Sequence, residues 1–216
     1  IGEIPPVRVR AGDWVDPQDL QDQLVALGYD AVDMVERRGQ VAVRGSIIDV
    51  FVPTSAHPLR LDMFGDEVEE IRHFNLSDQR TIDLAEGGLW APPARELLLT
   101  PKVRARALEV QNSLPGAAEM LELAAEGIYA PGLESLAPSL VDGMELLGDL
   151  IPADSLFILD EPERVTARGA DLLQTADEFL NAAWGAAALG GKIPVLAHSA
   201  SFTPFDEIWG KGAGRA

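Results

Sequence analysis

The chain has 216 residues, of which 47% are hydrophobic and 24% charged, and its formal net charge is −18. This composition predicts a packed core in one large domain or two small ones, and the acidic excess argues against independent binding of nucleic acid. The absence of cysteine excludes disulfides, thiolate metal sites and cysteine nucleophiles.

The sequence has no apolar run of the ~18 residues that a membrane-spanning helix needs. It begins with Ile1 and has no apolar stretch typical of a secretory signal. We therefore expect a cytoplasmic segment of a longer protein, without contact to a membrane.

The first part of the chain predicts a small α+β domain over residues 5–92. It begins with an alternating strand at 7–10. Asp16 and Pro17 then start a helix, because Asp is a favoured N-cap and Pro is favoured at the first helical position. Gly28 ends this helix. Its apolar stripe is formed by Leu20, Leu24 and Leu27.

Further strands are expected at 31–36, 40–44, 46–52, 59–64 and 68–74. A hairpin-like turn at 37–39 separates the first two. These short strands predict a mostly antiparallel sheet. Paired glycines at 87–88 and paired prolines at 92–93 predict the end of the domain.

The pattern then becomes helical, with helices expected at 103–114, 115–125, 133–147 and 164–189. Pro138 should break or kink the third of these helices. The apolar run 155–159, bounded by Asp154 and Asp160, predicts a short buried strand. Residues 93–205 are thus expected to form a largely helical α/β unit, followed by a flexible tail at 206–216.

A candidate binding surface lies on the strand at 59–64. Alternation gives it an apolar face of Leu59, Leu61 and Met63, and a mixed face of Arg60, Asp62 and Phe64. If the apolar face is core, Phe64 is exposed near an arginine, which is typical of a binding hot spot. On the preceding strand, Arg44 points outward together with Ala42 if Val41 and Val43 point inward. The alternative is that these are ordinary surface residues.

We expect no catalytic residues, no metal and no cofactor. Asp160 and Glu161 follow an apolar run as in a Walker B motif, but a nucleotide site also needs GxxxxGK[ST]. The segment that begins Gly190-Gly191-Lys192 does not fit that pattern. The three histidines have no spacing typical of metal ligands.

Three runs of letters between residues 38 and 81, VRGSIIDVF, PLRLDMFGDEVEEIR and SDQRT, closely resemble the second structural domain of UvrB and of the transcription-repair coupling factors. The likeness is greater to the coupling factors. Further on, YAPGLESL and LFILDEPERV match their UvrB-homology module more loosely. The resemblance implies docking of the damage-recognition ATPase UvrA through two arginines and an aromatic residue, which match Arg44, Arg60 and Phe64.

The resemblance also implies that this segment is non-enzymatic and links stalled transcription to nucleotide excision repair. Other domains of the parent, an ATP-dependent translocase, would contact RNA polymerase and DNA. Two alternatives stay open. The segment could come from a UvrB-like DNA-dependent ATPase or helicase, or it could be a structural module that only packs against other domains of its parent and covers Phe64.

Overall fold

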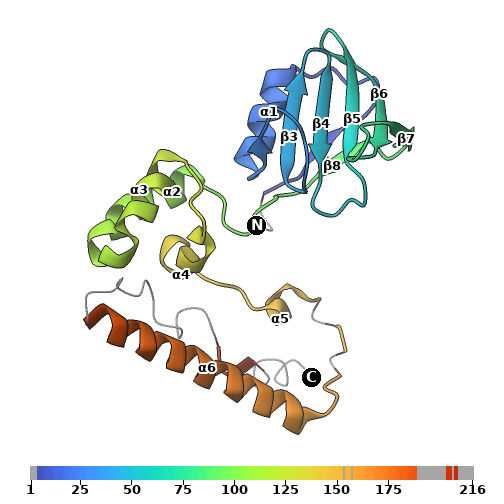
Figure 1. Ribbon diagram of the computed structural model, residues 1–216. Helices are drawn as coiled ribbons and strands as arrows, with labels where there is room; N and C mark the ends of the chain where they lie inside the picture. Colours follow the sequence, from blue (N-terminus) through green and yellow to red (C-terminus); the bar gives the residue numbers. More distant parts are fainter. Residues whose placement is uncertain (1–3, 153, 157, 189–202, 206, 209–216) are drawn as a thin grey trace. The chain divides into compact units, whose positions relative to one another are not determined.

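The computed structural model describes residues 4–152, 154–156, 158–188, 203–205 and 207–208. The chain forms two compact units, Ile1–Thr100 and Pro101–Ala216 (Figure 1). All strands of the described residues lie in the first unit, and helices dominate the described part of the second. The fold is therefore α+β, as the sequence predicts.

The first unit is built on a six-stranded sheet with the order β2-β3-β4-β5-β6-β7. Only the β2–β3 pair is parallel, and the other neighbours are antiparallel. The strands are β2 (Asp30–Ala31), β3 (Gln40–Arg44), β4 (Ile47–Phe51), β5 (Leu59–Phe64), β6 (Glu67–Phe74) and β7 (Thr81–Leu84). The predictions for β3 to β6 are confirmed to within one or two residues.

The helix α1 (Pro17–Ala26) lies beside β3 (Figure 1). It begins as predicted, because the Asp16 side chain accepts hydrogen bonds from the backbone N–H groups of Gln18 and Asp19. Its apolar stripe packs against one face of the sheet. The buried residues of this core include Leu20, Leu24, Leu27, Val41, Ile48, Val50, Leu59, Leu61, Met63, Val68 and Ile71.

A second, two-stranded sheet joins the two ends of the domain. In it β1 (Val7–Val9) pairs antiparallel with β8 (Leu89–Ala91), and Val7 lies opposite Ala91. Gly88 makes this pairing possible. Its φ is +69°, and a Cβ atom there would lie 2.4 Å from the carbonyl oxygen of Val9, so a side chain at this position would collide with the backbone of β1.

Residues 93–100 pack on the first unit. The backbone N–H of Ala94 donates to the carbonyl oxygen of Leu27, and Leu98 is part of the same core. The Arg95 guanidinium forms an ion pair of 2.8 Å with Asp30. The Tyr29 hydroxyl donates to the carbonyl oxygen of Pro92 at 3.0 Å, and burial raises the pKa of Tyr29 above its ordinary value.

The prediction of a strand at 31–36 is wrong beyond its first residue, because β2 ends at Ala31. The segment that follows turns back over the sheet, where Val35 packs against Ala42 and Phe51. These two sheet residues lie on the face opposite α1. Ala42 therefore points away from the main core, as predicted, but it is fully buried there.

The second unit begins with a compact group of helices. Its helical elements are α2 (Pro101–Val110), α3 (Ala118–Glu126), α4 (Ala137–Leu140), α5 (Leu147–Leu150) and α6 (Pro162–Ala188), with 3-10 turns at Gln111–Ser113, Pro115–Ala117 and Leu133–Leu136. The helices α2 and α3 are in contact and bury Ala107, Leu121 and Ala124. The predicted helix at 164–189 agrees with α6 over residues 164–188.

Two predictions for the second unit are wrong. The helix expected at 133–147 is divided into a 3-10 turn, α4 and α5, with non-helical backbone at 141–146; Pro138 lies in the first turn of α4. The described residues of 155–159 form no strand, and Leu156 and Ile158 are 86% and 82% exposed. The tail expected at 206–216 lies outside the described residues except for 207 and 208.

Candidate protein-docking site

Arg44, Arg60 and Phe64 all lie on the face of the six-stranded sheet opposite α1, called the outer face below. The pairing of the strands maps this face. Ala42, Asp49, Arg60 and Arg72 are successive partners across β3 to β6, and so are Arg44, Ile47, Asp62 and Glu70 in the next row. Alternation therefore places the three predicted residues on one face, with Phe64 one row beyond Asp62.

Asp49 is the centre of the charge arrangement on the outer face. Its side chain is fully buried, although it is an acid inside the apolar strand β4. The Arg60 Nε atom lies 2.7 Å from one carboxylate oxygen and Nη2 lies 2.9 Å from the other. Arg44 Nη2 lies 2.5 Å from the second oxygen. One buried carboxylate thus holds both predicted arginines.

Arg60 is bound within the domain. Its side chain is only 15% exposed, lies 4.4 Å above the ring centre of Phe74 and also donates to the backbone and side chain of Gln79. The hydrogen bond to Asp49 raises the pKa of Arg60, and the negative charges of Asp49 and Asp62 add to this effect. Arg60 is therefore not the free, exposed arginine that alternation suggests.

Arg44 and Phe64 are accessible. The Arg44 side chain is 40% exposed, and one of its guanidinium nitrogens, Nη2, bonds to Asp49. Phe64 ends β5 immediately before the turn at Gly65 and is 72% exposed. A cation and an apolar ring are thus both available to a partner.

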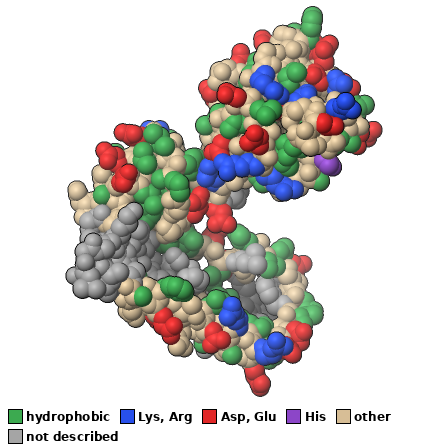
Figure 2. All heavy atoms as spheres, viewed as in Figure 1, with side chains coloured by type: hydrophobic (Ala, Val, Ile, Leu, Met, Phe, Trp, Pro, Cys, Tyr) green, Lys and Arg blue, Asp and Glu red, His purple; other side chains and the backbone are tan. Residues whose placement is uncertain are grey.

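A second ion-pair group lies beside the first. Arg72 Nη2 lies 2.9 Å from Asp62 and 2.8 Å from Glu70. These three side chains are between about a quarter and two fifths exposed. Asp62 thus pairs with an arginine of the neighbouring strand β6. Acidic and basic side chains are interspersed over the visible face of the first unit (Figure 2).

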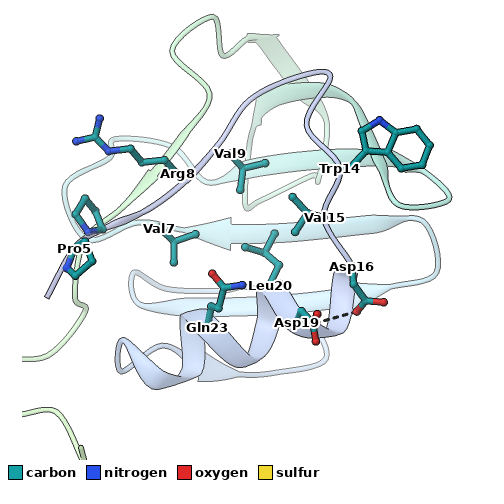
Figure 3. Close-up of a pocket in the computed structure, with 11 residues that line it drawn as sticks. Pro5, Val7, Arg8, Val9, Trp14, Val15, Asp16, Asp19, Leu20 and Gln23 are labelled. Carbon is teal, nitrogen blue, oxygen red and sulfur yellow. Dashed lines mark hydrogen bonds between the residues drawn. The ribbon is translucent and has the colours of Figure 1, made fainter.

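Trp14 extends the outer face beyond β6. It forms an isolated antiparallel bridge with Glu67, and Glu67 is the register partner of Phe64. Trp14 is 74% exposed. Trp14 is also one of the residues that line a hollow of about 460 Å³ between β1 and α1, and Figure 3 shows its ring at the margin of this hollow, directed away from Val7 and Leu20.

Sequence reasoning missed Asp49 and Trp14. An acid within an apolar strand whose neighbours carry arginines is a signal that could have found Asp49. Trp14 lies in the connection between a strand and a helix, where periodicity gives no information.

Among the described residues, no group of three His, Asp or Glu side chains is arranged to hold a metal ion. In the same residues, no helix is both long and apolar enough to cross a bilayer.

Comparison with known proteins relates this chain to one domain family and to one group of longer proteins. The sequence model of the family described as the UvrB interaction domain matches residues 7–92. The chain is 42% identical over 200 residues to the transcription-repair-coupling factor of Mycobacterium tuberculosis, a match that covers 88% of this chain and 16% of that protein. For the transcription-repair-coupling factor of Bacillus subtilis the identity is 30% over 203 residues, covering 82% and 17%.

The transcription-repair-coupling factor of Myxococcus xanthus is 38% identical over 169 residues, which cover 72% of this chain and 14% of that protein. The chain therefore spans less than a fifth of the length of these relatives. Residues 7–92 belong to the UvrB interaction domain family, and the chain is related over most of its length to the transcription-repair-coupling factors.

Proposed function

We propose that the first unit docks the damage-recognition protein UvrA and so links stalled transcription to nucleotide excision repair. The observation that carries this proposal is the exposed pair of Arg44 and Phe64 on the outer face of a UvrB interaction domain. The segment acts by binding, without catalysis of its own. Other parts of a longer cytoplasmic coupling protein contact RNA polymerase and DNA.

Two side chains contact UvrA directly. The Phe64 ring fills an apolar pocket, in the manner of aromatic residues that dominate binding energy at interfaces. Arg44 donates charge-assisted hydrogen bonds to a carboxylate of UvrA through the nitrogens that Asp49 does not hold. Both side chains protrude from strands of a packed sheet, so little backbone freedom is lost when they bind.

Arg60 has a different part in this arrangement. Because its guanidinium already binds both oxygens of Asp49, it acts as a positioning residue. It neutralises the buried carboxylate and fixes the place of Asp49. Asp49 in turn holds Arg44 at the surface of the outer face.

The test is a calorimetric titration of the chain with purified UvrA. We expect Phe64→Ala to weaken binding at least tenfold, by about 1.4 kcal/mol or more, with an unchanged thermal melt. Val25→Ala is the control, because Val25 is an exposed apolar residue on α1, which covers the opposite face of the sheet.

Two results would count against the proposal. Equal affinities of Phe64→Ala and the unaltered chain for UvrA would show that Phe64 does not contribute to the contact with UvrA. Failure of the unaltered chain to bind UvrA would overturn the docking function and favour a module that only packs within its parent.

A further inference from the structure

We propose that Trp14 is a second aromatic anchor of the docking surface and that a cationic side chain of UvrA packs against it. This inference rests on the proposed function, because it names further chemistry of the same partner. It starts from the row of side chains in which Phe64, Glu67 and Trp14 follow one another across neighbouring strands. Register partners in antiparallel strands project from the same face.

The backbone around Trp14 is held in place along β6. The N–H of Gly12 donates to the carbonyl oxygen of Val68 at 2.8 Å, and the N–H of Val15 donates to that of Asp66 at 2.7 Å. The N–H of Val68 donates back to Asp13 at 2.9 Å. Trp14 is therefore presented by an ordered backbone although three quarters of its side chain is exposed, and such preorganisation favours binding.

The two exposed aromatic residues are spaced to act together. Adjacent strands lie about 4.8 Å apart, so the backbones at Phe64 and Trp14 are separated by roughly 10 Å, with Glu67 between them. Two rings at this distance are within the footprint of one interface, which takes in about 20–30 residues on each side. Trp and Tyr are also the aromatic residues most enriched among interface residues that dominate binding.

The charges near Trp14 indicate what meets it. Glu67 is its bridge partner, and Asp13 and Asp66 are next to the two residues of that bridge in the sequence. None of the ion pairs within the described residues involves these three acids. A lysine or arginine of the partner can therefore lie over the indole ring and pair with Glu67 at the same time.

The end of the outer face at Arg44 favours an acidic side chain of the partner instead of a cationic one. There Arg44 offers guanidinium donors to a carboxylate, so the complementary surface of UvrA carries an acid at one end and a cation at the other. Complementary charges of this kind determine orientation more than affinity. The row from Phe64 to Trp14 and the position of Arg44 thus give the docked partner one orientation.

The experiment titrates the whole chain with purified UvrA and compares Trp14→Ala with Trp90→Ala. Trp90 is the matched control, because it is a 46% exposed tryptophan of the first unit that lies on β8 instead of the outer face. We expect Trp14→Ala to weaken binding about fivefold or more and Trp90→Ala to leave it unchanged. If Trp14→Ala lowers the melting temperature of the chain, Trp14→Phe is used as a second variant. It should retain most of the affinity, because it keeps an aromatic face.

A separate variant tests the pairing of Glu67 with a cationic side chain of UvrA. Glu67→Lys places a cation beside Trp14 and should weaken binding about tenfold at low salt, with a smaller loss at high salt because ions screen the repulsion. Glu86→Lys, at an exposed acid in the turn between β7 and β8, makes the same change of charge away from the outer face and serves as control.

The outcomes separate this inference from the proposed function. If Phe64→Ala weakens binding while Trp14→Ala and Glu67→Lys do not, Trp14 is not an anchor and the docking function stands. If the unaltered chain does not bind UvrA, the function itself fails. If Trp14→Ala abolishes self-association of the chain in sedimentation experiments without changing UvrA affinity, the ring is covered by a second copy, and the inference is overturned.

Discussion

Asp49 illustrates how a buried charge determines what the residues around it can do. A carboxylate with no exposed surface requires partners, because an unpaired buried charge is strongly destabilising. Arg60 provides two of the three bonds that Asp49 receives from arginine, and Arg44 provides the third. The more buried arginine therefore contributes mainly to the fold, and the more exposed one is available to a partner.

The first prediction concerns stability. Replacing Arg60 with alanine leaves Asp49 buried with one partner, which should lower the free energy of unfolding by about 3 kcal/mol. Urea denaturation measures this loss. Arg72→Ala is the control, since Arg72 is the register partner of Arg60 but forms its ion pairs at the surface, where such pairs contribute about 1 kcal/mol or less. Equal losses in the two variants would contradict the role given to Asp49.

The second prediction concerns Arg44. Arg44→Ala should weaken UvrA binding about tenfold while lowering the free energy of unfolding less than Arg60→Ala does, because Asp49 keeps both bonds from Arg60. Calorimetry measures the affinity of this variant for UvrA, and urea denaturation measures its free energy of unfolding. Arg44→Lys should restore only part of the affinity, because lysine lacks the planar fork of donors. A loss of stability as large as that of Arg60→Ala would show that Arg44 is structural.

At the scale of secondary structure, alternation predicts the strands well where one face is buried by α1. It fails at 31–36, where the apolar residues pack on the outer face through Val35 rather than extend a strand. It fails again at 155–159, because an apolar run alone cannot show whether a partner strand exists. Alternation also assigns Arg44, Arg60 and Phe64 to one face, but it cannot show that Arg60 reaches Asp49 on the neighbouring strand.

The third prediction concerns the β1–β8 sheet. Gly88→Ala places a Cβ atom against the carbonyl oxygen of Val9 and requires a left-handed φ of a residue that disfavours it. Thermal denaturation should show a marked loss of stability, larger than that of Gly12→Ala. Gly12 has a φ of +89° but no atom within 4 Å of its added Cβ, so the difference between the two variants isolates the collision. Equal losses would show that β1 can shift to accommodate the methyl group.

At the scale of the whole molecule, the division into two units has a direct consequence for truncation. The fourth prediction is that a chain ending at Thr100 unfolds in one cooperative transition and binds UvrA within about twofold of the full chain. A chain ending at residue 92 lacks Leu98 in the core and the bonds that Ala94 and Arg95 make to the first unit. It should therefore melt at a lower temperature, by several degrees per kcal/mol lost. Identical melts would mean that these contacts add no stability.

The boundary shows why sequence patterns alone leave the units uncertain. Glycines at 87–88 and prolines at 92–93 mark a change of backbone direction, but they do not show where packing stops. The residues that follow have no periodic pattern, and they join the first unit through Leu98 in the core, the partly buried Ala94 and a few polar bonds. Such contacts between distant segments are visible only once the chain is folded.

The pairing of β1 with β8 also determines how the domain would respond to mechanical load. Since Val7 lies opposite Ala91, the chain enters β1 and leaves β8 at adjacent points. A force pulling these two points apart would act on one backbone pair at a time and peel the short ladder open, instead of shearing all its hydrogen bonds together. The same adjacency would allow the domain to be inserted into a surface loop of another protein, or its natural ends to be joined and new ends opened elsewhere, with little disturbance of the sheet.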